Sequence, residues 1–141
     1  MRTGTMPSTF ITTRRVEFGD TDMAGIMHFS NFFRFMEAAE TEFLRTHGLS
    51  VTWVDSGRRV GFPRVSAACD YQKPAKFEDV LTISVTVEKI GRKSITYRHD
   101  FTRDADVIAT GRITAVYCRD NGNHQLESAE IPQEIRTKLE A

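Results

Sequence analysis

Three segments in the second half of the chain alternate between apolar and polar residues. Their apolar positions fall at every second residue or nearly so: Leu81, Ile83, Val85 and Val87; Ile95, Tyr97 and Phe101; Val107, Ala109, Gly111, Ile113, Ala115 and Tyr117. Period-two alternation is typical of half-buried strands, and short turns at Gly91 and at 103–106 join these strands as hairpins. The pattern predicts an antiparallel sheet with one apolar face, preceded by a strand at about 62–71.

One long segment, residues 30–47, repeats its apolar residues at helical spacing. The large apolar side chains recur three and four positions apart: Phe32, Phe35, Met36, Ala39, Phe43 and Leu44. Ser30 is suited to cap the start of this helix, and Gly48 is suited to end it. A single apolar helix and a one-faced sheet bury their apolar surfaces against each other, so the predicted class is α+β, with the sheet covering the helix.

Smaller elements complete the predicted order. A first strand is expected at 11–18, a short helical turn at 50–56 and a C-terminal helix at 131–139. Residues 1–9 have the composition of a disordered lead-in and lack the continuous apolar core of a secretory signal. The 141-residue sequence shows no repeat, low-complexity tract or linker, so residues 10–141 are expected to form a single domain.

The composition argues against several classes of protein. The 19 basic and 19 acidic side chains balance, so charge gives no support for a nucleic-acid or membrane-surface partner. No segment of the sequence approaches the ~20 apolar residues of a membrane helix. The two cysteines lack Cys-x-x-Cys spacing, which favours free thiols in a reducing cytoplasm over a disulfide. The four histidines show no spacing typical of metal ligands, so we expect no metal.

A short acidic loop between the first strand and the helix has the most chemical content. Residues 16–29 read Val-Glu-Phe-Gly-Asp-Thr-Asp-Met-Ala-Gly-Ile-Met-His-Phe. Two glycines flank a loop that carries Asp20 and Asp22, and the helix begins a few residues later. The free N–H groups at a helix start carry partial positive charge and favour a developing oxyanion. A carboxylate and an oxyanion donor so close together are the minimum equipment for attack on a carbonyl group.

On this loop and two further segments, the sequence resembles the hotdog-fold acyl-CoA thioesterases, in particular the 4-hydroxybenzoyl-CoA thioesterase type. The matching segments are Glu-Phe-Gly-Asp-Thr-Asp with Ala-Gly-Ile at 17–26, Pro-Ala-Lys-Phe-Glu-Asp-Val-Leu at 74–81, and Arg-Lys-Ser at 92–94. The resemblance implies a hotdog fold, an antiparallel sheet wrapped around one central helix. It implies hydrolysis of an acyl-CoA thioester without metal or organic cofactor. It also implies a homodimer, with a homotetramer as the larger option, whose sheets join edge to edge and whose active sites lie at the dimer interface.

The resemblance assigns roles to residues of the acidic loop. Asp22 matches the catalytic carboxylate, which attacks the thioester carbonyl or activates a water molecule that does so; the sequence does not choose between these roles. The alternative is that Asp22 only caps a turn or helix. Phe29 falls where the family uses a backbone N–H to polarise the thioester oxygen, and Gly25 is expected to allow close backbone approach there. Asp20 is expected to stabilise the turn.

Two positions beside this motif leave alternatives open. His28 departs from related thioesterases, which have an aromatic residue here and a histidine one position later. It either assists the substrate or is a hydrogen-bonded structural histidine. Glu37 matches a carboxylate near the far end of the acyl pocket, and the alternative is an ion pair with Arg34 on a solvated helix face. Another branch of hotdog thioesterases carries its catalytic glutamate on this helix, which makes Glu37 or Glu40 the backup catalytic residue.

Cationic turns supply candidates for holding the CoA phosphates, which need exposed positive side chains. Arg92 and Lys93 beside Ser94 are the first choice, with a solvated turn as the alternative. Weaker candidates of the same kind are Arg58, Arg59 and Arg64. Two rival functions are a hotdog hydratase or dehydratase, which the acidic motif fits poorly, and a non-catalytic acyl-CoA-binding subunit. The sequence leaves the acyl group open, with a polar-substituted aromatic group as one option.

Overall fold

The computed structural model describes residues 9–140, which form two antiparallel sheets and two helices. The helices are α1 (Asn31–Thr46) and α2 (Gln133–Glu140), and a 3-10 turn, η1 (Phe18–Asp20), follows the first strand. The strands are β1 (Thr9–Arg15), β2 (Thr52–Asp55), β3 (Arg58–Gly61), β4 (Arg64–Tyr71), β5 (Val80–Ile90), β6 (Ser94–Arg103), β7 (Asp106–Val116), β8 (Cys118–Asp120) and β9 (Leu126–Ser128).

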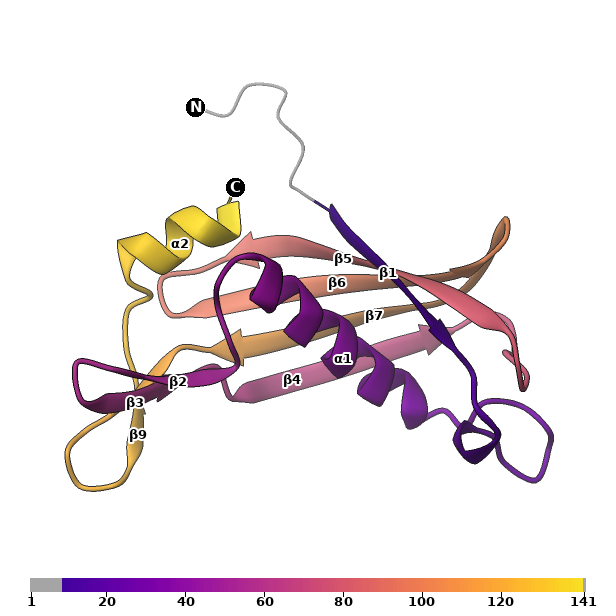
Figure 1. Cartoon of the computed structure of the whole chain (residues 1–141), viewed down its shortest axis with the longest axis horizontal. Helices are drawn as coiled ribbons and strands as arrows, with labels where there is room; N and C mark the ends of the chain where they lie inside the picture. Colours follow the sequence, from indigo (N-terminus) through magenta and orange to yellow (C-terminus); the bar gives the residue numbers. More distant parts are fainter. Residues whose placement is uncertain (1–8, 141) are drawn as a thin grey trace.

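The larger sheet lies across α1 (Figure 1). Its five strands run in the order β1-β5-β6-β7-β4, and neighbouring strands are antiparallel. Most apolar positions of the alternating segments are buried in one core with the helix, as at Leu81, Ile83 and Val85, whereas Val107 is exposed near a register shift between β6 and β7. This arrangement confirms the predicted α+β class, in which an antiparallel sheet covers one long helix.

The long helix confirms the prediction closely. It spans Asn31–Thr46, and all six of its predicted apolar contact residues are buried. Gly48 follows its end with a φ of 70°, a left-handed conformation that favours glycine. Packing explains the glycine at position 111 on β7, because a side chain there would clash with the Met36 side chain of the helix. The helix and the sheet are therefore fitted to each other in close contact.

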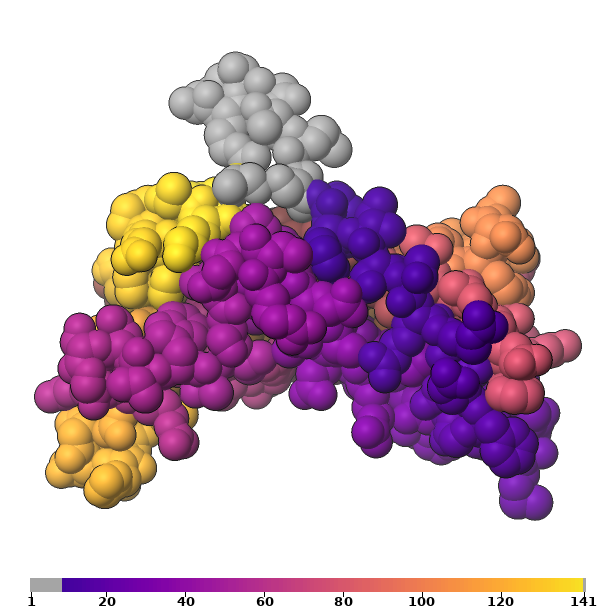
Figure 2. Space-filling model, viewed as in Figure 1, coloured from indigo at the N-terminus to yellow at the C-terminus, as the bar shows by residue number. Residues whose placement is uncertain are grey.

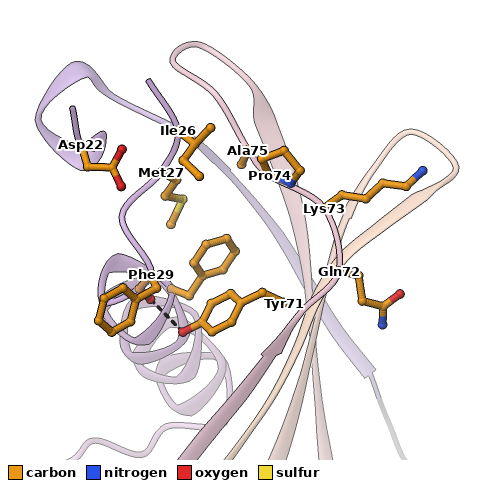
Figure 3. A pocket seen from close by; sticks show the side chains of 10 residues that line it. Asp22, Ile26, Met27, Phe29, Tyr71, Gln72, Lys73, Pro74 and Ala75 are labelled. Carbon is orange, nitrogen blue, oxygen red and sulfur yellow. Dashed lines mark hydrogen bonds between the residues drawn. The ribbon is translucent and has the colours of Figure 1, made fainter. Parts of the chain in front are cut away.

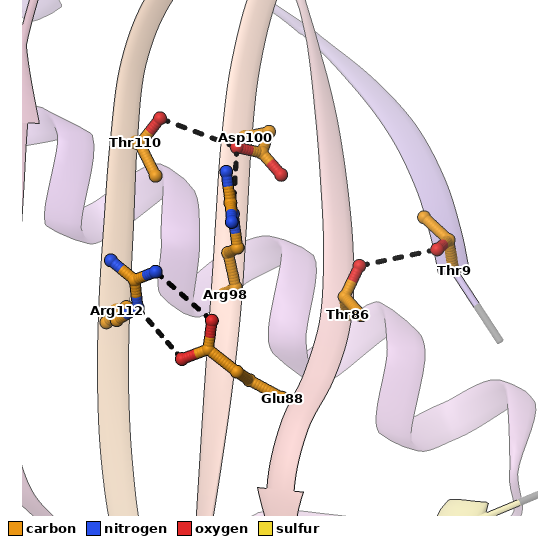
Figure 4. A network of polar contacts seen from close by, with 7 residues as sticks. All are labelled: Thr9, Thr86, Glu88, Arg98, Asp100, Thr110 and Arg112. Carbon is orange, nitrogen blue, oxygen red and sulfur yellow. Dashed lines mark hydrogen bonds and ion pairs between the residues drawn. The ribbon is translucent and has the colours of Figure 1, made fainter. Parts of the chain in front are cut away.

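The opposite face of the larger sheet is polar (Figure 4). Arg112 on β7 donates two hydrogen bonds to Glu88 on β5, at 2.8 and 3.1 Å. Arg98 and Asp100 form a second ion pair on β6, at 3.2 Å. These side chains are partly exposed, so each pair contributes little to stability. The two faces together account for the alternation in the sequence.

The smaller sheet corrects one prediction. The segment 50–56 is not a helical turn, because β2 pairs with β3 as a hairpin. The two residues between the strands, Ser56 and Gly57, have φ values of 53° and 80°. Positive φ at both positions is the geometry of a two-residue hairpin turn, and Gly57 serves that turn instead of ending a helix. Strands β8 and β9 complete this sheet in the order β2-β3-β8-β9.

Several predicted boundaries shift by a few residues. The first strand ends at Arg15 instead of residue 18, because η1 begins at Phe18. It starts at Thr9, and the rest of the predicted lead-in lies outside the described residues. The C-terminal helix begins at Gln133, directly after Pro132, a residue that fits the start of a helix.

Both cysteines are free thiols, as predicted. Burial raises the pKa of the Cys69 thiol to about 11, so this thiol keeps its proton at neutral pH. Neither helix between residues 9 and 140 has the length and apolar character needed to cross a membrane.

Candidate active site

Asp20 holds the acidic loop against the start of α1. Its main-chain carbonyl accepts hydrogen bonds from the His28 N–H at 2.8 Å and from Nδ2 of Asn31 at 2.9 Å. Its carboxylate accepts the Glu17 N–H at 2.8 Å and closes the η1 turn. Asp20 therefore stabilises the turn, as expected from the sequence. The same residue fixes the position of the loop relative to the helix.

Asp22 has one oxygen committed to the loop and one available. Its Oδ1 accepts the Ala24 N–H at 2.8 Å, which forms a local turn. Its main chain pairs with Ile26 at 2.9 Å and with Gly25 at 3.0 Å. Its Oδ2 accepts no hydrogen bond from any residue between 9 and 140. The half-buried carboxylate therefore stabilises a turn, as the capping alternative for Asp22 predicted. Its Oδ2 is still available to a substrate.

The N–H group of Phe29 is available as a donor. It makes no hydrogen bond within the part of the chain that the structure describes. The carbonyl of His28, in the same peptide unit as this N–H, accepts the Asn31 N–H at 2.9 Å. The carbonyl of Phe29 accepts the hydroxyl of Tyr71 at 3.0 Å. The peptide units on both sides of Phe29 are therefore fixed, while its own N–H stays unused.

The backbone of Gly25 adopts a conformation that favours glycine. Its φ is 80°, a left-handed conformation that other residues rarely adopt. An added side chain would meet no atom of the described chain within 4 Å. The turn that carries Asp22 requires this conformation, and the space beside Gly25 is open within the described chain.

A mainly apolar pocket of about 450 Å³ opens between the acidic loop, the start of α1 and the end of β4 (Figure 3). It is lined by Asp22, Ile26, Met27, Phe29, Phe32, Tyr71, Gln72, Lys73, Pro74 and Ala75. Asp22 also borders a second hollow of about 520 Å³, whose lining includes Phe18, Met23 and Phe77. The carboxylate and the Phe29 residue therefore face a common space large enough for a ring-sized acyl group.

His28 makes local contacts of the kind expected of a structural histidine. Its Nδ1 lies 2.7 Å from the Ser30 hydroxyl and accepts the Ser30 N–H at 3.2 Å. Its ring stacks on the Phe29 ring, with centroids 4.6 Å apart. Ser30 occupies the N-cap position, but its hydroxyl bonds to His28 and makes no cap bond. The histidine thus holds the helix start in place of the predicted serine cap.

Residues 16–139 match the family model described as the thioesterase-like superfamily. The chain belongs to this superfamily. It is 33% identical over 127 residues to a 4-hydroxybenzoyl-CoA thioesterase from Pseudomonas sp. (strain CBS-3), covering 84% of this chain and 89% of that one.

Solved structures agree with this assignment. A gentisyl-coenzyme A thioesterase superposes with a TM-score of 0.76 at 29% identity, covering 90% of this chain and 99% of the other. A 4-hydroxybenzoyl-CoA thioesterase variant in complex with 4-hydroxybenzoyl-CoA gives a TM-score of 0.77 at 26% identity, over 94% and 99% of the two chains. The comparisons confirm the predicted resemblance, the hotdog fold and the enzyme class, a thioester hydrolase.

The two helix glutamates of this thioesterase have different environments. Glu37 is exposed and forms no ion pair with Arg34 within residues 9–140. Glu40 is fully buried; its Oε1 accepts a hydrogen bond from Arg64 at 2.8 Å, and its Oε2 lies 3.2 Å from Nε2 of His99. The His99 contact is at ion-pair distance but is not aligned as a hydrogen bond. Glu40 is thus committed to the core and is a poor backup catalytic residue.

The turn 92–94 lies far from the acidic loop in one subunit. It joins β5 to β6, whereas the loop packs beside the other end of β5, where the Val16 N–H bonds to the Asp79 carbonyl at 2.8 Å. The 11 residues of β5 separate the two places by roughly 30 Å. Arg136 of α2 bonds to the Gly91 carbonyl at 2.8 Å, and Figure 2 shows α2 and the loop at opposite ends of the molecule. One chain therefore does not bring Arg92, Lys93 and Ser94 to Asp22.

Two residues that contact the site were not singled out from the sequence. Asn31 bonds to Asp20, and Tyr71 bonds to Phe29. Asn31 had a weak signal, because a polar residue at a helix start often bonds to the preceding turn. Tyr71 had none, since its partner lies 42 positions away in the sequence.

Proposed function

We propose that the protein hydrolyses an acyl-CoA thioester with an aromatic acyl group, releasing the free acid and CoA. The observation that carries this proposal is the pairing of a free Asp22 oxygen with an unused Phe29 N–H beside one apolar pocket. The names of relatives support the aromatic class, since they act on 4-hydroxybenzoyl-CoA and gentisyl-CoA. The rings of Phe32 and Tyr71 in the pocket offer an aromatic acyl group edge and face contacts.

The proposed chemistry begins with the thioester oxygen at the Phe29 N–H and the carbonyl carbon at Oδ2 of Asp22. The carboxylate either attacks this carbon itself or removes a proton from a water molecule that attacks it. The Phe29 N–H stabilises the negative oxygen of the tetrahedral intermediate. The C–S bond then breaks, the electron pair leaves with sulfur, and CoA departs as the thiol after protonation. If Asp22 is the nucleophile, water hydrolyses the resulting anhydride. Neither route uses a metal or an organic cofactor.

We propose that two subunits build each site. Strand β4 ends the larger sheet and pairs only with β7 among the described residues, so its outer edge is free to pair with a second copy. Antiparallel pairing of two β4 edges sets the Tyr71 end of one strand beside the Arg64 end of the other. Arg64 lies across from Ala115, and Ser94 from Val116, so the turn 92–94 shares that end of the sheet.

Such a homodimer brings Arg92 of the partner subunit and Lys93 of the partner subunit toward the pocket, where they would hold the CoA phosphates. The exposed Glu37 would likewise serve a site across the interface, near a polar group of the acyl part. Pairing of dimers into a tetramer is compatible with this arrangement and is not required by it.

An acyl-CoA panel tests the function. Release of free thiol is measured with benzoyl-CoA, 4-hydroxybenzoyl-CoA, acetyl-CoA and hexanoyl-CoA, and we expect the aromatic thioesters to have the highest kcat/KM. Binding of acyl-CoA without thiol release would support a non-catalytic subunit. Hydration of a 2-enoyl-CoA without thiol release would support a hydratase. Preference for hexanoyl-CoA would retain the thioesterase and reject the aromatic class.

Subunit complementation tests the shared site. The Arg92→Ala/Lys93→Ala variant should raise KM roughly tenfold through lost phosphate contacts, and Asp22→Asn should be nearly inactive. Unfolding the two variants together at equal amounts and refolding them forms heterodimers in which one of two sites is intact. We expect kcat/KM to recover to about a quarter of the wild-type value. A mixture no better than the average of the separate variants would contradict the shared site, and light scattering checks that dimers have formed.

A further inference from the structure

The hydroxyl of Tyr71 connects the sheet to the residue that carries the oxyanion donor (Figure 3). Tyr71 is the last residue of β4, and its hydroxyl donates to the Phe29 carbonyl at 3.0 Å. Its ring meets the Phe32 ring edge-on, with centroids 5.1 Å apart and an interplanar angle of 76°. The hydroxyl is thus aimed by a packed ring on a strand, which is a more rigid support than a loop side chain.

The protonation state of Tyr71 suits this contact. Burial, with the neighbouring Cys69 as a smaller cause, raises the pKa of the Tyr71 hydroxyl to about 12. The hydroxyl therefore keeps its proton throughout the neutral range. It can therefore donate to the Phe29 carbonyl at neutral pH.

The contact from Tyr71 adds to two longer hydrogen bonds that hold the peptide unit after Phe29, one of them from the Ser30 N–H to Nδ1 of His28 at 3.2 Å. On the N-terminal side, the His28 carbonyl is held by the Asn31 N–H at 2.9 Å. On the C-terminal side, the Phe29 carbonyl accepts the Phe32 N–H only at 3.3 Å, which is a long bond for the first turn of a helix. The shorter bond from Tyr71 fixes the Phe29–Ser30 peptide unit, whereas the Phe29 N–H belongs to the His28–Phe29 unit that the Asn31 N–H holds. Because Phe29 joins these two units, fixing both of them fixes its backbone torsions and so the placement of its N–H relative to the pocket.

We propose that Tyr71 is a positioning residue of this enzyme, whose hydroxyl orients the Phe29 N–H toward the thioester oxygen. This inference rests on the proposed role of Phe29 as the oxyanion donor. An oxyanion donor acts only when it is aimed at the place where charge develops, and full loss of one donor lowers kcat by about 10²–10³. A donor that is present but free to turn should lose part of that effect.

The Tyr71→Phe variant removes the hydroxyl and keeps the ring that packs on Phe32. We expect kcat to fall about tenfold with KM nearly unchanged, because the interaction is made in the transition state. The fall should be equal for benzoyl-CoA and 4-hydroxybenzoyl-CoA. Amide hydrogen exchange, measured by NMR, should become faster at 29–32 and stay unchanged in β6. The matched control is Tyr117→Phe, which removes a buried hydroxyl without a partner among the described residues and should leave kcat unchanged.

Two results would overturn the inference. Wild-type kcat in Tyr71→Phe, together with unchanged exchange at 29–32, would show that the hydroxyl does not hold the donor. A rise in KM confined to 4-hydroxybenzoyl-CoA would show that the hydroxyl contacts the substrate instead. Failure of the proposed function gives a different result, since the wild-type protein itself would then release no CoA from any thioester.

Discussion

Replacement of Asp22 by asparagine is expected to lower kcat by at least about 10²-fold, because an amide neither attacks a carbonyl nor takes a proton from water. The fold of the loop should survive the change. Oδ1 of an asparagine can still accept the Ala24 N–H that Asp22 accepts at 2.8 Å. The measurement is thiol release from an aromatic acyl-CoA, with the midpoint of thermal unfolding recorded for the same preparation.

Asp20→Asn is the matched control for this experiment. It changes the other carboxylate of the same loop, and its amide oxygen can still accept the Glu17 N–H. We expect kcat within a few-fold of the wild type. Near-wild-type turnover in Asp22→Asn would reject Asp22 as the reacting carboxylate. A large loss in both variants would mean that the charge of the whole loop matters, and not one oxygen of Asp22.

Replacement of Arg64 by methionine is expected to lower the free energy of unfolding by about 3 kcal/mol. This value is at the low end of the losses seen when one partner of a buried ion pair is removed. Glu40 is fully buried, and Arg64 donates to it at 2.8 Å from a side chain that is 24% exposed. Without the arginine, the carboxylate is left in the core beside His99, and neither of its oxygens then has a hydrogen-bond donor among the described residues. Equilibrium unfolding in urea measures the loss.

A double variant and a surface variant make this prediction specific. Removing both charges in Glu40→Met/Arg64→Met should recover much of the lost stability, because no unpaired charge stays buried. Arg112→Met breaks the exposed pair with Glu88 on the outer face (Figure 4) and should cost about 1 kcal/mol or less. A double variant as unstable as Arg64→Met alone would show that packing, and not the unpaired carboxylate, causes the loss.

The elements that local sequence predicted well are those with a strong period. The six apolar residues of α1 and most of the alternating positions of β5 to β7 were expected to be buried on one face, and they are, except that Val107 is exposed. The hairpin β2–β3 was misread because its strands have four residues each, too few for a period to appear. Gly57 was then assigned to a helix end, although a hairpin turn uses the same left-handed conformation.

The site residues also differ in whether a local sequence pattern could predict them. Asp22, Phe29 and Gly25 belong to one continuous loop, so a local motif sufficed to propose them, and the structure sets Asp22 and Phe29 at a common pocket. The burial of Glu40 and the bond from Tyr71 to Phe29 join segments 24 or more positions apart. No local pattern contains such contacts, because they exist only once the sheet has closed over the helix.

The sequence by itself determined the fold class, the family and the acidic loop, since periodicity and a contiguous motif are properties of neighbouring residues. Only the tertiary structure decided which residues of these segments contact one another and which lie far apart. It gave Asp20 its two acceptor roles, committed Glu40 to a buried pair with Arg64 and separated the turn 92–94 from its own acidic loop by the length of β5. The physical reason is that packing and long-range hydrogen bonds depend on where the chain returns to itself.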